Sequence, residues 1–309
     1  MDTYIAVDIG GTQLRAAVFE EGQISPVFSK RIPTRGEESA VERLLGLLAD
    51  CWPSHGTVRG IGLAAPGPTN GRLGIIYRAP NIAGWIDLPL AQIVRERFKV
   101  PTALGNDANM AALGEWKYGA ARGHQYVLYI TISTGIGAGI IDNGILVEGV
   151  SGLAGELGHT TVQADGPMCG CGHRGHLETF SSGTAIANFV REQLAQGAPS
   201  VLAGKSDISA QDVSMAAEAG DPLSKQAMNR AGTYLGHAIA DFLHLLNPSI
   251  VVLGGGVSRS GPLLIEPVRA AIAERVMAPD FLNGLTIATA ALGDDSGLMG
   301  AFALAQSAR

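Results

Sequence analysis

Two of the chain's three cysteines lie close to three of its seven histidines, in the segment GHTTVQADGPMCGCGHRGHLE. Tetrahedral Zn²⁺ takes four nitrogen or sulfur ligands, and Cys169 and Cys171 supply two thiolates. His159 is a reasonable third ligand. His173 follows Cys171 closely, whereas His176 has enough intervening residues to fold back toward the same ion. We therefore expect a zinc site of His159, Cys169, Cys171 and His176, with a metal-free loop of exposed histidines as the alternative.

Glycine-rich turns, DIGGT, STGIGAG and GGG, follow three apolar segments of the chain. Glycines let backbone N–H groups approach an anion closely, and a threonine hydroxyl adds a donor. A carboxylate beside a phosphate makes chemical sense with a cation, so Asp8 indicates Mg²⁺. Each turn alone is also typical of an ordinary tight turn, but the three together favour a nucleoside triphosphate. The candidate nucleotide-binding residues are Asp8, Gly10, Gly11, Thr12, Thr134, Gly135, Gly137, Gly254, Gly255 and Gly256.

Neither of two common nucleotide motifs accounts for these turns. The second turn lacks the G-x-x-x-x-G-K-[ST] spacing of a P-loop. A Rossmann dinucleotide site needs a helix directly after its glycines, and both DIGGT and STGIGAG return to a strand pattern. The sequence therefore indicates phosphate binding by strand-to-strand turns.

The pair Asn106-Asp107 stands directly before a segment with a helical pattern at 108–118. Asn and Asp are common N-cap residues, because their side-chain oxygens accept hydrogen bonds from the first N–H groups of a helix. A carboxylate here could also accept the proton of an attacking hydroxyl group. The positive potential of the helix N-terminus should keep Asp107 ionised, which suits that role. A simple cap and a general base both fit these residues.

The periodicity of the sequence predicts the strands and helices that must position these residues. Strands are predicted at 3–9, 14–19, 61–64, 126–132, 139–142, 250–253 and 285–289. Helices are predicted at 38–51, 88–98, 108–118, 183–194, 222–246, 261–276 and from 296 onward.

An internal repeat relates two of the predicted hairpins. Tyr4, Thr12 and Gly22 recur 122 residues later as a tyrosine, a threonine and a glycine at positions 126, 134 and 144. Strand, small-residue turn and return strand thus occur twice, although chance could produce a match of this size. The repeat predicts two similar α/β halves with a ligand cleft between them.

Composition limits the classes of protein that the chain can belong to. Its 309 residues are 46% hydrophobic, enough for two domains with real cores. A net charge of −6 argues against nucleic acid or an anionic membrane as partner. The opening MDTYIAVDIGG lacks the basic start of a signal peptide, and the apolar runs are too short to cross a bilayer. With an odd number of cysteines as well, we expect a soluble, cytoplasmic globular protein.

Taken in order, the motifs resemble those of the ROK family of sugar kinases and sugar-responsive repressors. The matching motifs are DIGGT (8–12) and ISTGIGAG (132–139) for phosphate, GNDAN (105–109) for catalysis, GELGH (155–159) for sugar, CGCGHRGHLE (169–178) for zinc, VVLGGG (251–256) for adenosine and LGDDSGLMGA (292–301) for the start of the C-terminal helix. The resemblance implies the α/β actin-like ATPase (ribonuclease H-like) fold, with two α/β domains around a cleft. The smaller domain would comprise 1–118 and 296–309, and the larger domain, 119–295, would carry the zinc loop and a dimerisation surface.

The resemblance also implies roles for individual residues. Asp107 matches the general base, and the sugar-binding residues would be Asn81, Asn106, Asp107, Glu156, His159 and Glu178. His159 would bind zinc through one ring nitrogen and the sugar through the other. This chain has His176 where the usual loop has a third cysteine. Imidazole also binds zinc, so we expect a bound ion, held more weakly in a slightly reshaped loop.

The implied activity is ATP-dependent phosphorylation of a hexose, with the 6-hydroxyl of glucose as the expected acceptor. ATP, Mg²⁺ and a structural Zn²⁺ are the implied cofactors, and a homodimer or homotetramer the implied assembly. The alternatives within the enzyme class are an N-acetylmannosamine or N-acetylglucosamine kinase, and then a fructokinase. The non-enzyme alternative is a sugar-binding regulator without turnover. A DNA-binding regulator is disfavoured, because the first predicted strand begins near residue 3 and the net charge is negative.

Overall fold

The computed structural model describes residues 2–308 and shows an α/β protein that divides into two compact units. The first unit comprises 1–125, 139–155 and 290–309. The second comprises 126–138 and 156–289. The chain therefore passes four times from one unit to the other, at the ends of these segments.

The predicted domain boundaries differ from these units mainly at 139–155. The prediction put this segment in the second domain, whereas it belongs to the first unit. The strand β10 (Ile136–Asp142) begins in the second unit and continues into the first. A unit boundary inside a continuous strand leaves no composition shift in the sequence that could reveal it.

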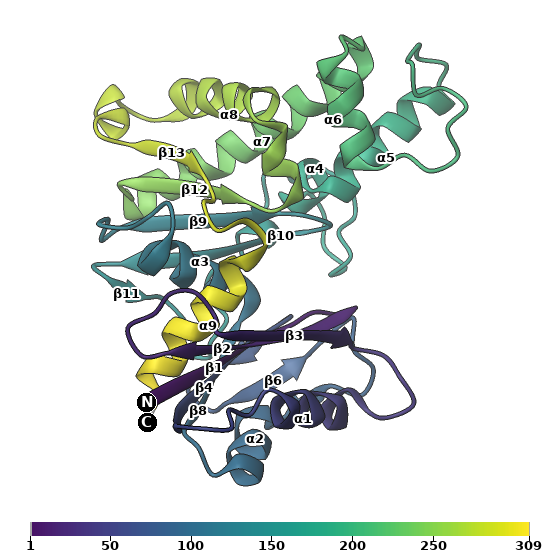
Figure 1. Cartoon of the computed structure of the whole chain (residues 1–309). Coiled ribbons are helices and arrows are strands. Elements are labelled where there is room, and N and C mark those ends of the chain that lie inside the picture. Colours follow the sequence, from purple (N-terminus) through teal and green to yellow (C-terminus); the bar gives the residue numbers. More distant parts are fainter. Residues whose placement is uncertain (1, 309) are drawn as a thin grey trace. The chain divides into compact units, whose positions relative to one another are not determined.

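The first unit is built on a five-stranded sheet with the order β3-β2-β1-β4-β8 (Figure 1). Its strands are β1 (Asp2–Ile9), β2 (Gln13–Glu20), β3 (Phe28–Pro33), β4 (Thr57–Ala65) and β8 (Thr102–Asn106). β1 pairs antiparallel with β2 across a short glycine turn, and parallel with β4, which pairs parallel with β8. The carboxyl ends of β1 and β8 therefore lie at the same edge of the sheet, where Asp8 and Asn106 are found.

Alternate residues of β1 face two different hydrophobic cores, as the two-residue period of a strand requires. Ile5, Val7 and Ile9 belong to one core, and Ala6 belongs to the other. The helices that cover the two faces are α1 (Ala40–Asp50) and α2 (Leu90–Phe98) on the first, and α3 (Asp107–Tyr118) and α9 (Ser296–Ser307) on the second. Because both faces are covered, β1 is an almost continuous apolar run, which made it visible in the sequence.

The C-terminal helix α9 is a layer of the first unit. A Cβ atom added at Gly300 would lie 1.7 Å from the carbonyl oxygen of Met110, so this glycine lets α9 approach α3 closely. The ring of Phe302 stacks on that of Phe19, with centroids 4.1 Å apart. The last helix thus completes the core formed by the first hairpin.

A small antiparallel sheet, β5-β6-β7, completes the first unit. Its strands are β5 (Thr69–Asn70), β6 (Ile75–Arg78) and β7 (Ile86–Leu88). These strands were not predicted, and neither were β3 and β8. β5 and β7 are too short to show an alternation, and β3 is exposed along most of its length, so it has no apolar run to recognise.

The second five-stranded sheet has the order β11-β10-β9-β12-β13. Its strands besides β10 are β9 (Val127–Ile132), β11 (Ile145–Leu146), β12 (Ile250–Gly254) and β13 (Thr286–Thr289). The helices of the second unit are α4 (Glu178–Ser181), α5 (Gly183–Ala195), α6 (Ala210–Glu218), α7 (Pro222–Leu246) and α8 (Pro262–Arg275). Four short 3₁₀ segments, η1 (Leu157–His159), η2 (Gly256–Ser260), η3 (Pro279–Leu282) and η4 (Gly293–Asp295), are described in the chain.

The two large sheets have the same strand pairing. β9 takes the place of β1, β10 that of β2 and β11 that of β3, and the parallel strands β12 and β13 correspond to β4 and β8. The hairpins that carry the 122-residue repeat, β1-β2 and β9-β10, thus occupy equivalent positions. The predicted repeat of two similar α/β halves is confirmed by this order.

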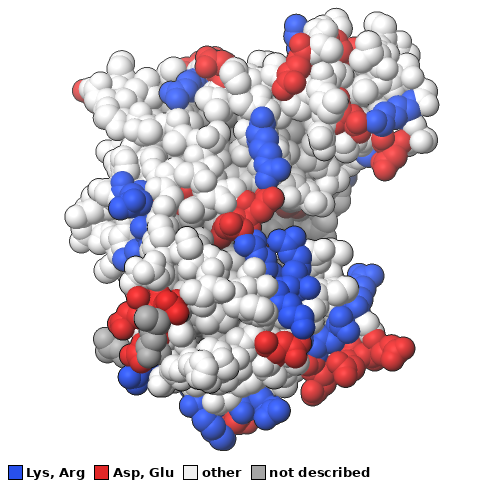
Figure 2. Space-filling view, in the orientation of Figure 1, with Lys and Arg blue, Asp and Glu red and all other residues white. Residues whose placement is uncertain are grey.

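Charged side chains of both signs are interspersed on the face shown in Figure 2, with wide uncharged areas between them. The acidic side chains that give the net charge of −6 thus do not form a single acidic patch on this face. Within residues 2–308, no helix combines the length and the apolar character needed to cross a membrane.

Candidate active site and metal centre

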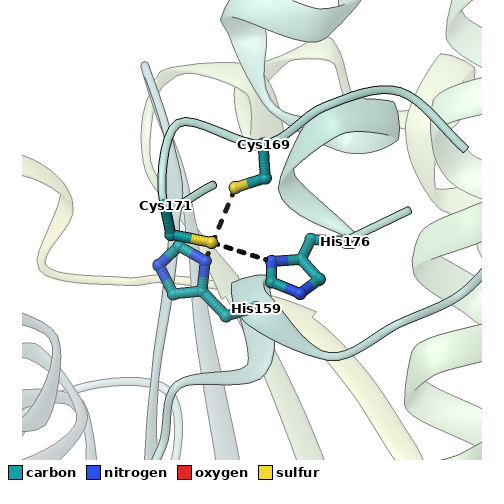
Figure 3. Close-up of side chains that lie close together, drawn as sticks. All are labelled: His159, Cys169, Cys171 and His176. Carbon is teal, nitrogen blue, oxygen red and sulfur yellow. Dashed lines mark hydrogen bonds between the residues drawn. The ribbon is translucent and has the colours of Figure 1, made fainter. Parts of the chain in front are cut away.

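The four predicted metal ligands lie together in the second unit (Figure 3). One ligand atom from each of His159, Cys169, Cys171 and His176 lies within 4.8 Å of the other three. Nδ1 of His159 is 3.7 Å from Sγ of Cys169, and Nδ1 of His176 is 3.3 Å from Sγ of Cys171. His173 is exposed and stands outside this group.

The backbone of the loop accounts for this arrangement. The N–H of Cys169 donates to the carbonyl oxygen of His173 at 2.7 Å, which closes a tight knuckle with both thiols on it. The N–H of Leu177 donates to the carbonyl oxygen of Thr160 at 2.9 Å, which brings His176 beside η1. Gly175 has φ +73°, a conformation that glycine adopts without strain. It also packs against the backbone of Gln163, where there is no room for a side chain.

The group fits tetrahedral zinc in geometry and in donor chemistry. Zn–S bonds of about 2.3 Å and Zn–N bonds of about 2.0 Å place neighbouring S and N ligands about 3.5 Å apart, close to both measured pairs. Burial raises the pKa of the Cys169 thiol. Burial, and then the neighbouring His159 and His173, lower the pKa of His176, which favours the neutral imidazole that binds metals. Metal binding would release the thiol protons.

Glu178 connects the metal loop to the second glycine turn. Its Oε1 lies 3.9 Å from Sγ of Cys169. Its Oε2 accepts a hydrogen bond from the backbone N–H of Ile136 at 3.0 Å. A Cβ atom added at Gly135 would lie 2.4 Å from that same oxygen, so the turn needs glycine where the carboxylate approaches. The structure therefore brings Glu178 and His159 together around Cys169.

The turn before η1 positions Glu156 and His159. Glu156 precedes η1, and its carbonyl oxygen accepts the N–H of His159 at 3.0 Å. Gly158 packs against β10, where an added Cβ atom would lie 2.2 Å from the carbonyl oxygen of Ile136. Both Glu156 and His159 are exposed. They can therefore reach a ligand from outside the core of the second unit.

Asn106 and Asp107 lie in the first unit, where β8 ends and α3 begins. Oδ1 of Asn106 caps the helix, since it accepts the N–H groups of Ala108 at 3.0 Å and Asn109 at 3.2 Å. Its Nδ2 donates to the carbonyl oxygen of Gly67 at 3.0 Å. Asn106 is thus the cap, as the sequence allowed, and Asp107 is the exposed first residue of the helix. Oδ1 of Asp107 also accepts the N–H of Ala108, at 2.8 Å.

The first glycine turn follows Asp8 and contacts Asn81, and all these residues belong to the first unit. Gly11 packs on Asn81, where an added Cβ atom would lie 2.7 Å from Cβ of the asparagine. The N–H of Gly10 closes the turn on the carbonyl oxygen of Gln13 at 2.8 Å, and Thr12 is exposed. Burial raises the pKa of Asp8, while nearby arginines act in the opposite direction. A bound cation would favour the ionised carboxylate.

A cavity of about 760 Å³ opens in the second unit, at the carboxyl ends of β9 and β12. Thr134, Thr184 and Gly256 line it, and α6 forms a further wall. Its volume lies in the usual range for small-molecule sites, and phosphates favour backbone N–H groups at such strand ends. The hydroxyl of Thr184, at the start of α5, donates to the carbonyl oxygen of Thr134 at 2.8 Å. The sequence analysis did not single out Thr184, which lies between two motifs.

The three glycines after β12 differ in what they do. A Cβ atom added at Gly254 would lie 2.3 Å from the hydroxyl oxygen of Tyr129, and one at Gly255 would lie 2.4 Å from the carbonyl oxygen of Ile132. Gly255 also has φ +80°. An added Cβ atom at Gly256 would have no neighbour within 4 Å. Two of these glycines therefore serve the packing of β12 on β9, and the third faces the cavity.

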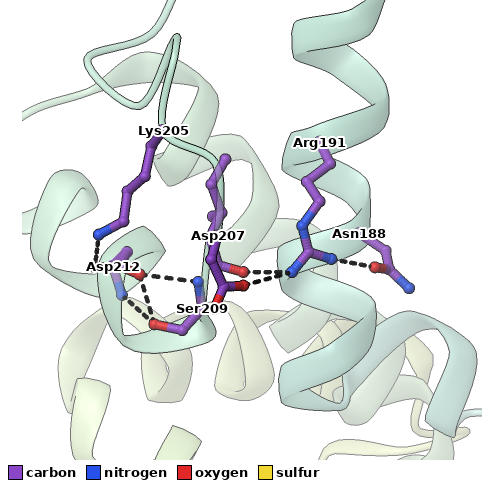
Figure 4. Close-up of polar contacts among 7 residues, drawn as sticks. Asn188, Arg191, Lys205, Asp207, Ser209 and Asp212 are labelled. Atoms are coloured by element: carbon purple, nitrogen blue, oxygen red, sulfur yellow. Dashed lines mark hydrogen bonds and ion pairs between the residues drawn. The ribbon is translucent and has the colours of Figure 1, made fainter.

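Polar contacts hold the 195–209 connection at the rim of this cavity (Figure 4). Nη2 of Arg191 donates to the carbonyl oxygen of Ile208 at 2.6 Å and lies 3.8 Å from Asp207. Ser209 and Asp212 form a capping box at the start of α6. Asp207, Ile208 and Ser209 of this connection form part of the cavity wall.

A second cavity, of about 500 Å³, lies beside the first in the same unit. Thr134 and Thr184 line both cavities. Glu178 and Gly170 of the metal loop line only the second. The metal loop, Glu178 and the second glycine turn thus line neighbouring cavities of the second unit.

Comparisons with known proteins identify the class. The ROK family model matches residues 4–308. The glucokinase of Halalkalibacterium halodurans is 39% identical in an alignment of 310 positions that covers 96% of this chain and 93% of that protein. The structure of a ROK family glucokinase from Streptomyces griseus, in complex with glucose and AMPPNP, has a TM-score of 0.82 and 32% identity, covering 99% of both chains. A ROK family transcriptional regulator, a homolog of the E. coli MLC protein, has a TM-score of 0.90 and 28% identity, covering 99% of this chain and 78% of that one.

The repeated sheets, the glycine turns at their strand ends and these structural likenesses define an actin-like ATPase fold. The chain belongs to the ROK family. The predicted fold and family are both confirmed.

Proposed function

We propose that this protein is a glucokinase that transfers the γ-phosphoryl group of ATP to the 6-hydroxyl of glucose. One observation carries the proposal: Glu178 touches both the metal loop and the second glycine turn, beside a cavity of nucleotide size. The similarity to a Halalkalibacterium halodurans glucokinase and to a glucokinase structure with glucose and AMPPNP supports this substrate pair.

In this proposal, Asp107 is the general base. Its carboxylate accepts the proton of the 6-hydroxyl as the hydroxyl oxygen attacks the γ-phosphorus. Phosphoryl transfer has a loose transition state, so alignment and neutralisation of charge contribute more than the base does. Asp107 is exposed at the start of α3, where a bound sugar can reach its carboxylate.

The sugar hydroxyls are bound by Asn81, Asn106, Glu156, His159 and Glu178, as the family resemblance implies. The glycine turns at 10–12 and 134–137 donate backbone N–H groups to the phosphates, and the turn at 254–256 borders the nucleoside. Asp8 holds Mg²⁺, which neutralises charge on the phosphates when bound.

A structural zinc ion is held by His159, Cys169, Cys171 and His176. Bound zinc fixes the conformation of the loop and the ring orientation of His159. Nδ1 of His159 faces Cys169, so its Nε2 is left to contact the sugar. Through the contact between Cys169 and Glu178, bound zinc also restrains the position of Glu178, a second proposed sugar ligand.

A panel of hexoses with ATP and Mg²⁺ tests the function. Coupled detection of ADP should give the highest kcat/KM for glucose. A higher value for N-acetylmannosamine, N-acetylglucosamine or fructose would replace glucose as the substrate. Sugar binding without ADP release would instead indicate the regulator, the alternative that the likeness to a ROK transcriptional regulator favours. A cytoplasmic location and a homodimer or homotetramer stay predictions from the sequence.

A further inference from the structure

Glu115, near the end of α3, is a fully buried carboxylate with 0% exposure. Its Oε1 accepts the N–H of Leu292 at 2.8 Å and the hydroxyl of Ser296 at 2.9 Å, which Ser296 shares with the carbonyl oxygen of Gly293 at 2.8 Å. Its Oε2 accepts the N–H of Ala120 at 2.8 Å and the N–H of Ala291 at 3.0 Å. All these residues belong to the first unit. Each carboxylate oxygen therefore takes two donors.

The partners of Glu115 stand where the chain leaves or enters the first unit. Ala291 is the second residue of the segment that returns from the second unit at 289–290. The next residue of α3, Trp116, donates from Nε1 to the carbonyl oxygen of His124 at 2.6 Å, just before the chain leaves at 125–126. Two consecutive residues of α3 thus hold the ends of two connecting segments.

The opposite end of α3 is Asp107, the proposed general base. Sliding of α3 along α9 is prevented by close packing. A Cβ atom added at Gly114 would lie 2.3 Å from the carbonyl oxygen of Ser296, and the contact of Gly300 with Met110 is equally tight. A packed interior transmits displacements as a rigid body. A shift at the Glu115 end of the helix therefore moves Asp107 too.

The chemistry of this position requires a carboxylate. An ionised carboxyl group only accepts hydrogen bonds, and each of its oxygens can take two donors. Within residues 2–308, Glu115 has hydrogen-bond donors around it and no cation. A glutamine would turn its NH₂ group toward two of the four donors in either orientation. Burying a carboxylate carries a desolvation cost that its hydrogen bonds must offset, so a gain in stability alone is a poor reason for this arrangement.

We propose that Glu115, assisted by Trp116, is a positioning residue that fixes Asp107 relative to two of the segments connecting the units. This inference rests on the proposed kinase function. Because α3 is bonded to both segments and packed tightly on α9, a displacement of either segment moves α3 and Asp107 as one body.

Glu115→Gln tests the proposal in the full-length protein. Misplacement of a reacting group by about 1 Å can cost about 100-fold in rate, so kcat should fall about 10- to 100-fold. The KM for ATP should change less than about threefold, since the cavity proposed for the nucleoside lies in the second unit and the first-unit turn proposed for the phosphates, 10–12, is on the β1-β2 hairpin rather than on α3. Amide hydrogen exchange at Ala291 and Leu292 should accelerate at least about tenfold, because both amides lose a charged acceptor.

Leu48→Ala is the matched control. Leu48 is fully buried in the other core of the first unit, and its truncation should lower Tm substantially without touching α3. The proposal predicts near wild-type kcat for Leu48→Ala below its Tm. Equal losses of kcat in the two variants at equal losses of Tm would show that Glu115 is merely structural and would overturn the proposal.

Two milder variants decide the matter if Glu115→Gln does not fold. Ser296→Ala removes one of the four hydrogen bonds, and Trp116→Phe removes the bond to His124 while keeping a ring. Each should lower kcat about threefold or more, the equivalent of one ordinary hydrogen bond. Unchanged kcat in both would contradict the inference. A wild-type protein without any kinase activity would instead remove the proposed function on which the inference rests.

Discussion

Oε1 of Glu178 lies 3.9 Å from Sγ of Cys169, so a proposed sugar ligand touches a proposed metal ligand. The other oxygen of Glu178 is bound to the backbone directly after the second glycine turn. One carboxylate therefore connects the metal loop to the second glycine turn. A metal bound by this loop would influence phosphoryl transfer without taking part in it, because it would hold the proposed sugar ligand in place.

The metal centre can be tested by comparing two histidines of one loop. We expect stoichiometric zinc in the purified protein, strongly reduced in His176→Ala and unchanged in His173→Ala, because His173 stands outside the ligand group. Loss of His176, one of the four proposed zinc ligands, should also raise the KM for glucose while leaving the KM for ATP nearly unchanged. Metal analysis after gel filtration measures the first effect. Wild-type protein without zinc would contradict the assignment.

Gly135→Ala tests the approach of Glu178 to the glycine turn. The added methyl group would lie 2.4 Å from Oε2 and must displace the carboxylate from the N–H of Ile136. Losing a hydrogen bond to a charged group costs about 1.5–3 kcal/mol, so kcat/KM for glucose should fall about 10- to 100-fold. Gly46→Ala, in the open on α1, should raise stability by about 0.5–1 kcal/mol and leave catalysis unchanged. A fully active Gly135→Ala protein would refute the role of Glu178.

The neighbouring glycines Gly255 and Gly256 should respond to alanine in opposite ways. Gly255→Ala combines φ +80° with a clash against the carbonyl oxygen of Ile132, so Tm should fall markedly. Gly256→Ala has open space around it on the cavity side, so Tm should hold while the KM for ATP rises. Thermal melts and ATP titrations of the two variants separate the effects. An unaltered KM for ATP in Gly256→Ala would place the nucleotide elsewhere.

Asp221, the cap of α7, should make stability depend on pH. Burial would raise its pKa, but hydrogen bonds from Ser224, Val201 and Ser200 outweigh burial and hold the pKa below its ordinary 3.8. A carboxyl group with a lowered folded-state pKa stabilises the fold above its unfolded-state pKa, and this stabilisation is lost as the pH falls below about 4. The difference in Tm between wild type and Asp221→Asn should therefore be large at pH 7 and shrink below about pH 4. A constant difference across this range would show that ionisation of Asp221 is unimportant.

Long or fully buried elements could be predicted from the sequence, whereas short ones could not. β1 is apolar along most of its length because both sheet faces are covered, and α7 carries a long amphipathic pattern with a proline at its start. β5 and β11 are two residues each, and each pairs with the adjacent strand of the chain. Two residues are too few to show an alternating pattern.

The residues of the candidate site also fall into those that the sequence predicted and those that it did not. The Cys/His cluster was predictable because four ligands with suitable spacing occur in one short segment. Glu115 and Thr184 were missed, because their partners are backbone atoms far away in the chain, such as the N–H of Ala291. A buried glutamate in a helix has no sequence signature that separates it from a solvated one. Only the folded chain reveals its four donors.

The turnover of Asp107→Asn is the most direct test of the account. Asparagine keeps the size of the side chain and removes its ability to accept a proton, while the cap on α3 remains with Asn106. With ATP, Mg²⁺ and saturating glucose, kcat should fall about 10²- to 10⁴-fold, as is typical for loss of a general base, with the Kd for glucose retained. A variant that phosphorylates glucose at nearly the wild-type rate would contradict the proposed mechanism.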